Sequence, residues 1–301
     1  MNARRISTAA LITVALSPLA ASQAVAADIY QQHENVVYGD VHGIGLLMDI
    51  FVPTGEGNGL GIVDVASGGW HSDRGKIRDH KLARVYDIMC AKGYTVFAVR
   101  PGSITRFSGS DMLDNLKRGI RWVKDHAADY DIDPTRLGLM GGSAGGHLAC
   151  LASVSPDNGD TDTTVCATAV FFPPTDFFDW DGVSVKPGSE GRLGELMTRM
   201  VSASGVDGLT DEQIEERLHN ISPARLVTAD APPFLLIHGD ADPVVPLQQS
   251  ETMLSALKKA GVSAELIVKP GGQHPWPTIY EEVKVIGDWF DRQLPKTAAV
   301  Q

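Results

Sequence analysis

The sequence predicts an α/β fold: one domain with a mostly parallel eight-stranded sheet, flanked by helices and interrupted by one lid-like insertion. Short runs rich in β-branched residues alternate with longer helical patterns, which is typical of βαβ units. Five of the later runs are almost continuously apolar, as expected for strands covered by helices on both faces. No repeat or low-complexity linker divides the chain, so we expect a single domain over residues 28–301.

The expected elements follow in chain order. The first two strands, at residues 35–38 and 46–52, flank a turn at residues 42–45, so we expect an antiparallel hairpin. Six further strands are expected at residues 61–66, 95–99, 137–141, 165–171, 234–238 and 264–268. Helical patterns lie between and after them, at residues 76–91, 111–128, 145–153, 251–260 and 280–294.

Residues 173–210 interrupt this alternation. The segment is irregular and Gly-rich, and its one short helical pattern lies at residues 193–200. Long irregular insertions in compact domains are often binding loops or lids. Phe177, Phe178 and Trp180 lie near its start, so a substrate-facing role is expected, with simple packing as the alternative.

The N-terminal residues 1–27 have the pattern of a secretory signal peptide. Arg4 and Arg5 precede an uncharged apolar stretch at residues 6–20, and A-V-A at residues 24–26 is a cleavage signal. We therefore expect a secreted or periplasmic mature protein, with a retained anchor as the alternative. No second apolar segment is long enough to be membranous, so no stable membrane insertion is expected after leader removal.

Composition and charge narrow the function. The chain has 301 residues, of which 43% are hydrophobic and 21% charged, so it can bury a core. Its formal net charge of −11 disfavours phosphate contacts, and no nucleic-acid partner is expected. The oligomeric state stays undetermined. Cys90, Cys150 and Cys166 lie far apart, and both one disulfide with a free thiol and three apolar thiols remain open.

The strongest local motif is G-G-S-A-G at residues 141–145, between an apolar strand and a helical pattern. A serine on such a tight strand-to-helix turn is exposed as a nucleophile, and flanking glycines remove side chains that would collide across the turn. Ser143 is therefore the expected nucleophile. The N–H group of Ala144, at the start of the following helix, is placed to receive an oxyanion.

A serine hydroxyl needs an imidazole to accept its proton and a carboxylate to orient that imidazole. Among the nine histidines, His274 alone lies on a loop between the last expected strand and the C-terminal helix, so it is the expected base. Asp240 and Asp242 share the turn after the strand at residues 234–238. Asp242 is favoured because it lies deeper in the turn, whereas Asp240 is expected to bond the backbone of that turn.

These segments resemble the α/β-hydrolase fold. The resemblance rests on D-I-D-P-T-R-L at residues 131–137, G-S-A-G-G-H-L-A at residues 142–149, H-G-D-A-D-P-V-V-P at residues 238–246, and His274. It is strongest to the esterases related to hormone-sensitive lipase and to the bifunctional carbohydrate acetyl and feruloyl esterase group. It covers about residues 35–294.

The resemblance also implies an oxyanion motif of the H-G-G-G-W type after the third strand. This sequence has A-S-G-G-W at residues 66–70, so the histidine and the first glycine of the motif are missing. Gly68, Gly69 and Trp70 can still present backbone N–H groups, and with Ala144 they are the expected oxyanion-hole residues. Which of the first three amides point inward stays open.

The function implied is an exported serine carboxylic-ester hydrolase that acts on small acyl esters, by resemblance acetyl or feruloyl esters of carbohydrates. Its partner would be a small-molecule or polysaccharide ester, with no metal or organic cofactor. Trp70, Phe177, Trp180 and Trp276 are expected to form an aromatic rim for the substrate. Amide hydrolysis, as in arylformamidase or prolyl-oligopeptidase-type enzymes, and an inactive hydrolase used as a binding module are the alternatives.

Overall fold

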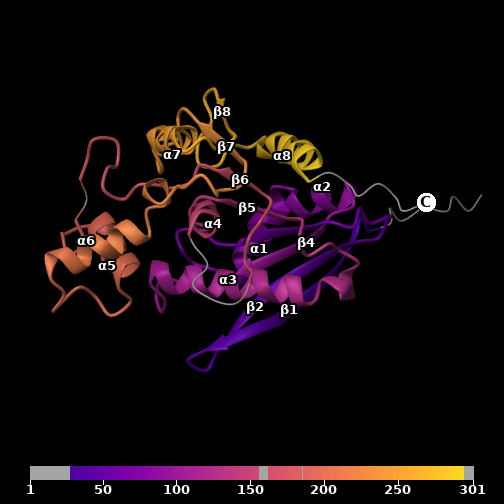
Figure 1. Ribbon diagram of the computed structural model, residues 1–301, viewed down its shortest axis with the longest axis horizontal. Coiled ribbons are helices and arrows are strands. Elements are labelled where there is room, and N and C mark those ends of the chain that lie inside the picture. Colours follow the sequence, from indigo (N-terminus) through magenta and orange to yellow (C-terminus); the bar gives the residue numbers. More distant parts are fainter. Residues whose placement is uncertain (1–27, 156–161, 185, 295–301) are drawn as a thin grey trace, which may run out of the picture.

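The computed structural model describes residues 28–155, 162–184 and 186–294, so the expected leader lies outside the described residues. Its centre is an eight-stranded sheet in the order β1-β2-β4-β3-β5-β6-β7-β8 (Figure 1). The pairs β1–β2 and β2–β4 are antiparallel, and the other five pairs are parallel. The predicted mostly parallel eight-stranded sheet is therefore confirmed.

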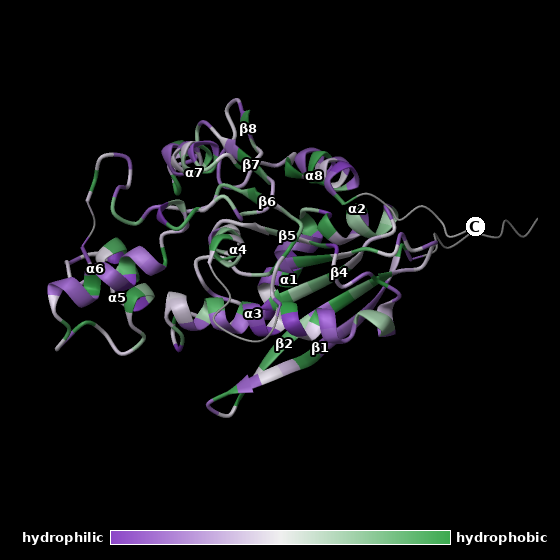
Figure 2. Ribbon diagram, in the orientation of Figure 1, coloured by the Kyte–Doolittle hydropathy of each residue, from purple (hydrophilic) through white to green (hydrophobic). Residues whose placement is uncertain are grey.

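The central strands form the buried core of the sheet. The strands are β1 (Tyr30–Val41), β2 (Ile44–Pro53), β3 (Gly61–Val65), β4 (Thr95–Arg100), β5 (Leu137–Gly142), β6 (Ala167–Phe171), β7 (Phe234–Gly239) and β8 (Ala264–Lys269). Every residue of β3, β4, β6 and β7 is buried, which matches their mostly apolar sequences. Figure 2 shows mostly hydrophobic colours along the inner strands and both colours on the helices.

Helices cover both faces of the sheet. The α-helices are α1 (Arg74–Leu82), α2 (Val85–Ala91), α3 (Gly109–Asp125), α4 (Ala144–Val154), α5 (Arg192–Val201), α6 (Asp211–Asn220), α7 (Leu247–Lys259) and α8 (Ile279–Gln293), with short 3-10 helices η1 (Ala127–Tyr130) and η2 (Pro223–Arg225). One hydrophobic cluster joins α3, α4 and α7 to the sheet. The other joins α1, α2 and α8 to the opposite face.

The structure divides one predicted helix into two. A single helix was predicted at residues 76–91, but α1 ends at Leu82 and α2 begins at Val85. Arg84 between them has a φ of 60°, in the left-handed region. A continuous right-handed helix cannot contain that conformation, so the chain turns here.

A helix that was not predicted follows the expected insertion of residues 173–210. The expected helical pattern at residues 193–200 is α5, and α6 follows it and packs against it. Thr210 and Gln213 form a capping box at the start of α6. This T-x-x-Q spacing was the available sequence signal. Figure 1 shows α5 and α6 together at one end of the molecule, away from the sheet.

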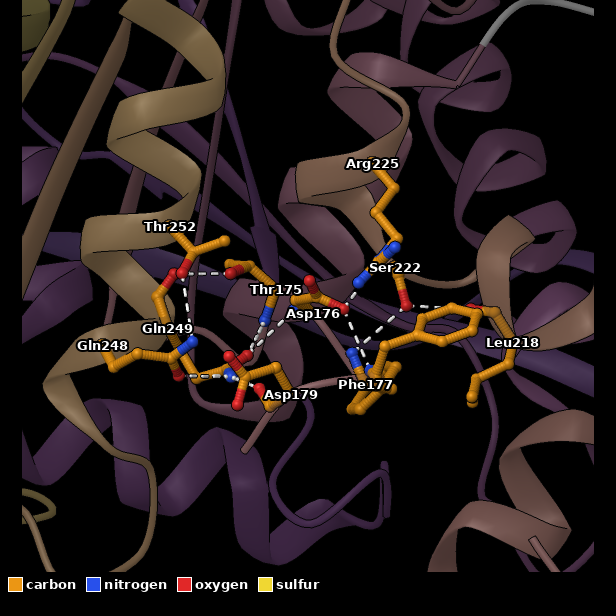
Figure 3. Close-up of polar contacts among 11 residues, drawn as sticks. Thr175, Asp176, Phe177, Asp179, Leu218, Ser222, Arg225, Gln248, Gln249 and Thr252 are labelled. Atoms are coloured by element: carbon orange, nitrogen blue, oxygen red, sulfur yellow. Dashed lines mark hydrogen bonds and ion pairs between the residues drawn. The ribbon is translucent and has the colours of Figure 1, made fainter. Parts of the chain in front are cut away.

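The start of the insertion is tied to the domain by buried polar contacts (Figure 3). The side-chain oxygen of Gln249 on α7 accepts the N–H groups of Thr175 and Asp176 at 2.7 and 2.8 Å. Arg225 in η2 donates to the Asp176 carboxylate at 2.8 Å. Because these partners come from two separate elements, the first residues of the insertion are held in place next to the sheet.

Among the described residues, no helix combines the length and hydropathy needed to span a membrane. The three cysteines are free thiols: Cys90 and Cys150 are buried and Cys166 is partly buried. Burial raises the pKa of Cys90 to about 12, which makes it an apolar packing residue rather than a reactive thiolate.

Candidate active site

Ser143 lies in the tight turn between β5 and α4. Its φ of 53° and ψ of −121° are strained for a residue with a side chain. The flanking glycines are required by space, because a Cβ on Gly141 would lie 2.6 Å from the carbonyl group of Gly145. A Cβ on Gly145 would lie 2.2 Å from the carbonyl oxygen of Val65. The turn therefore packs directly against the end of β3.

The structure brings Ser143, His274 and Asp242 into contact. His274 Nε2 lies 2.8 Å from Ser143 Oγ, and His274 Nδ1 lies 2.6 Å from Asp242 Oδ2. These pairs are separated by 131 and 32 positions in the chain. Each residue follows a parallel strand, β5, β7 or β8, and the carboxyl ends of parallel strands meet at one edge of the sheet. The ring of Phe172 packs beside His274, with centroids 4.3 Å apart.

Asp242 is ionised in this environment. Burial opposes ionisation, but contacts with His238 and His274 and two backbone N–H groups hold its pKa far below the ordinary value. Those N–H groups belong to Val244 and Val245 and donate to Oδ1 at 2.8 and 3.0 Å. An ionised carboxylate can only accept hydrogen bonds, so His274 Nδ1 carries the proton that it donates to Asp242. Nε2 of His274 is then left as the acceptor.

The two polar neighbours of Asp242 support its turn. Asp240 was expected to bond the backbone of its own turn. Its Oδ1 instead accepts the N–H group of Gly271 at 2.6 Å and so joins two loops. His238 is fully buried, and its Nε2 lies 2.9 Å from the carbonyl oxygen of Val245 and 3.4 Å from Asp242 Oδ2. His238 was not among the residues expected at the site.

Three of the four predicted oxyanion-hole residues keep an unengaged backbone N–H group. Gly68 does not, because its N–H donates to the carbonyl oxygen of His71 at 3.0 Å. Within the described part of the chain, the amides of Gly69 and Trp70 donate to no acceptor. Ala144 is the first residue of α4, where the N–H groups have no acceptor within the helix. These amides can therefore bind an anion.

The side chain of Trp70 anchors the loop that carries these amides. The indole Nε1 donates to His147 Nδ1 on α4 at 3.0 Å, and His147 Nε2 donates to the carbonyl oxygen of Ile221 at 2.8 Å. Burial lowers the pKa of His147 to about 4, so the ring is neutral at pH 7. The network joins the oxyanion loop, α4 and the segment after α6.

Ser143 lies where two cavities meet. The larger, of about 910 Å³, is bounded by the oxyanion loop and by residues of α5 in the insertion. The smaller, of about 330 Å³, extends along the sheet face covered by α1, α2 and α8. Residues lining both cavities are Gly68, Gly69, Lys76, Ser143 and His274. A carbon atom bonded to Ser143 would therefore have room for one substituent on each side.

The predicted aromatic rim is only partly present. Trp180 lines the larger cavity. Trp70 also borders that cavity, but it is 4% exposed and its ring packs against His147 and Phe177. Phe177 is 2% exposed and packs against Trp70 and His147 instead. Trp276 is 5% exposed, and its indole N–H donates to Glu282 on α8 at 2.7 Å. The structure thus buries the rings of Trp70, Phe177 and Trp276, which removes large apolar surfaces from water.

Comparison with known proteins identifies the family. The BD-FAE family model matches residues 48–257. The chain belongs to the BD-FAE family. Probable carboxylic ester hydrolase LipM of Mycobacterium tuberculosis is 28% identical over 224 residues, which cover 71% of this chain and 48% of LipM. Esterase LipQ of the same organism is 28% identical over 212 residues, covering 67% and 46%. The chain spans about half the length of these two relatives.

A solved structure is similar in fold to this BD-FAE member. It is described as a truncated form of a carbohydrate esterase from gut microbiota, and it matches with a TM-score of 0.74 at 26% identity. The match covers 90% of this chain and 99% of that one. The α/β-hydrolase fold that the sequence resemblance implied is confirmed.

Two polar residues near the site of this BD-FAE member were missed in the sequence. Asp64 is the residue before the last in the buried strand β3, and His80 on α1 contacts it at 2.6 Å; both line the smaller cavity. A single acid within an apolar strand was the available signal. Among the described residues, no group of three or more His, Cys, Asp or Glu side chains is arranged to hold a metal ion.

Proposed function

We propose that this chain is a serine carboxylic-ester hydrolase that works through an acyl-enzyme. One observation carries the proposal: Ser143, His274 and Asp242 form a continuous hydrogen-bonded chain beside unengaged backbone amides. A nucleophile, a base, an orienting carboxylate and oxyanion donors are the groups that acyl transfer requires. The name of LipM, a probable carboxylic ester hydrolase, and that of esterase LipQ support the same reaction.

In the first step, Ser143 Oγ attacks the ester carbonyl carbon while His274 Nε2 accepts the hydroxyl proton. The carbonyl oxygen becomes an oxyanion, which the N–H groups of Gly69, Trp70 and Ala144 are proposed to bind. Asp242 stays ionised and stabilises the imidazolium that forms. His274 then gives its proton to the alcohol oxygen as the C–O bond breaks, and the acyl group remains on Ser143.

In the second step, water replaces the alcohol. His274 takes a proton from the water molecule, and the resulting oxygen attacks the acyl carbon. The tetrahedral intermediate uses the same amides, and its collapse returns the proton to Ser143 Oγ. The products are a carboxylic acid and the regenerated hydroxyl, so the mechanism uses only groups of the chain and water.

For the substrate, we propose small acyl esters of carbohydrates, such as acetyl or feruloyl esters. The structural neighbour named a carbohydrate esterase supports this class. Trp180 on the wall of the larger cavity offers an aromatic surface of the kind that packs against sugar rings. Acetylated xylan, methyl ferulate and p-nitrophenyl esters of increasing length form a panel that ranks the acyl and alcohol preferences.

The reaction is tested on p-nitrophenyl acetate with wild type and Ser143→Ala. We expect Ser143→Ala to lower kcat/KM by about 10⁴-fold or more. A fluorophosphonate probe should label the wild type at Ser143 and leave the variant unlabelled. Ser255→Ala, on the exposed face of α7, is the matched control and should behave as the wild type in both assays.

Two results would contradict the proposal. Faster turnover of aminoacyl p-nitroanilides than of matched esters would identify an amidase. Absence of both turnover and labelling in the folded wild type would identify an inactive hydrolase fold that serves as a binding module.

A further inference from the structure

The smaller cavity beside Ser143 has a mostly apolar wall. Its lining includes Val85 on α2, Met140 on β5, Phe171 on β6 and Val283 on α8. Such a surface suits a carbon chain or an aromatic ring. The larger cavity is bordered instead by charged residues of the insertion, including Arg192 and Arg199. If the two substituents of an ester carbonyl occupy these two spaces, the acyl group belongs in the smaller one.

One polar feature stands out on that apolar wall. Asp64, the fourth of the five residues of β3, is fully buried, and a buried acid is costly unless its oxygens are bonded. Its Oδ2 accepts hydrogen bonds from His80 Nδ1 at 2.6 Å and from the Tyr86 hydroxyl at 3.2 Å. Its Oδ1 has no partner among the described residues. An acid kept at this position, with one oxygen unbonded, points to a role beyond packing.

His80 is the part of this pair that the cavity can reach. Asp64 holds Nδ1, so the orientation of the ring is set, and the His80 side chain keeps 17% of its surface exposed. No described residue bonds its Nε2. Burial lowers the pKa of His80, but the carboxylate of Asp64 outweighs burial and raises it overall. Asp79 and Lys76, also on α1 and lining the cavity, form an ion pair with each other at 3.3 Å.

We propose that the smaller cavity holds the acyl group of the ester and that His80, oriented by Asp64, hydrogen-bonds a hydroxyl group carried by that acyl group. This inference rests on the proposed function. A hydroxyl both donates and accepts, so it complements the imidazole whichever protonation state the ring has. An acyl group whose chain is hydrocarbon alone would leave Nε2 of His80 without a hydrogen-bond partner.

The sheet register gives the length of the acyl group. Asp64 pairs with Met140 on β5, three residues before Ser143. With a strand rise of about 3.3 Å per residue, the backbone of Asp64 lies roughly 7 Å below the end of β5 at Gly142, and Ser143 follows in the turn above that end. An acetyl group is too short to reach the polar pair. A hydroxyl at the far end of a hydroxyaryl acyl group, such as 4-hydroxycinnamoyl, has the reach that the register requires.

The test compares two esters that differ in one group. Methyl 4-hydroxycinnamate carries the distal hydroxyl, and methyl 4-methylcinnamate replaces it with a methyl group of similar size. We expect the wild type to prefer the hydroxyl ester by about tenfold or more in kcat/KM, because a site built for a hydroxyl rejects the analogue that lacks it.

Variants at His80 separate recognition from general damage. His80→Asn places an amide where Nδ1 contacts Asp64 but removes Nε2, so the preference should fall to nearly onefold. His80→Gln extends an amide toward the position of Nε2 and should recover part of the preference. His33→Asn, on the exposed surface of β1, is the matched control and should keep the wild-type ratio.

The outcomes distinguish this inference from the proposed function. Turnover of p-nitrophenyl acetate with no hydroxyl preference, or with an unchanged preference in His80→Asn, overturns the inference and leaves the ester hydrolase intact. If the wild type hydrolyses no ester, calorimetry measures the binding of free 4-hydroxycinnamic and 4-methylcinnamic acids and so tests the inference independently of turnover. A hydroxyl preference in binding then supports the site, and equal binding overturns it.

Discussion

The backbone at Ser143 shows why single residues matter at this site. A residue with a side chain occupies the left-handed region there, which costs about 1–3 kcal/mol and must be offset by its surroundings. The surroundings are close: Ser143 N–H bonds the carbonyl oxygen of Phe171 at 2.9 Å, and Gly145 N–H bonds that of Ser67 at 3.2 Å. The turn is held by neighbouring strands, so its shape depends on the small size of the glycines.

Gly145→Ala tests this dependence. The added Cβ would meet the Val65 carbonyl oxygen at 2.2 Å, and because that atom is backbone, the turn itself must shift. We expect the free energy of unfolding to fall by about 1–3 kcal/mol, measured by urea denaturation. Ester turnover should fall about 100-fold or more, since Ser143 and Ala144 move with the turn.

Gly55→Ala is the control for this substitution. No atom lies within 4 Å of the Cβ that it adds, and its φ is not in the left-handed region. It should therefore retain wild-type stability and turnover. Equal behaviour of the two variants would show that the close packing at Gly145 does not constrain the turn.

At the scale of elements, α4 holds two loops in register through one buried ring. His147 bonds Trp70 of the oxyanion loop on one side and Ile221, after α6, on the other. Burial lowers the pKa of this ring to about 4, so the ring stays neutral until the pH falls near that value. A change at this ring would therefore move the loop that presents the amides of Gly69 and Trp70, and also the segment after α6.

This buried histidine makes stability depend on pH. In the unfolded chain the pKa of His147 is near 6.5. Between that pH and about 4, the unfolded state therefore binds a proton at His147 and the folded state does not. We expect His147 to contribute a loss of stability of ~3 kcal/mol as the pH falls from 6.5 to 4. Urea unfolding of wild type and His147→Gln at several pH values measures this loss.

The variant should lack this part of the pH dependence. The glutamine side chain in His147→Gln does not titrate, so the free energy of unfolding of this variant should change less between pH 6.5 and 4 than that of the wild type. His33→Gln, which replaces an exposed histidine, should follow the wild type. Parallel curves for wild type and His147→Gln would refute the assignment.

At the scale of the whole molecule, the parallel sheet assembles the site. Its strands end at a common edge, and three loops from that edge supply the hydroxyl, the imidazole and the carboxylate. Between β6 and β7 the chain adds α5 and α6 at one end of the molecule (Figure 1). Residues of α5 border one side of the larger cavity. Substrate access therefore depends on parts of the chain that are not in the sheet.

The fate of the whole chain in the cell is a further proposal. We propose that residues 1–27 direct export and are removed, because they have the basic, apolar and A-x-A regions of a signal peptide. Expression of the full chain in a bacterium should yield a periplasmic protein that begins at Ala27 or Asp28. Ala26→Arg should block cleavage, and Ala21→Ser should not. An uncleaved, membrane-bound wild type would instead support a retained anchor.

The sequence alone determined the sheet, the turn at Ser143 and the order of the three contacting residues. These follow from local rules: apolar runs form buried strands, glycines permit a tight turn, and loops after parallel strands share one edge. His274 and Asp242 could be named because each follows a strand within such a loop.

Only the tertiary structure decided which contacts those residues make beyond their own loops. In the folded chain the N–H group of Gly68 is hydrogen-bonded, and the rings of Phe177 and Trp276 are buried. The chain turns at Arg84, and Asp64 bonds His80. Such contacts join residues far apart in sequence, and they depend on how helices pack against the sheet. Local patterns determine the elements, but the packing of whole surfaces determines which polar atoms find partners.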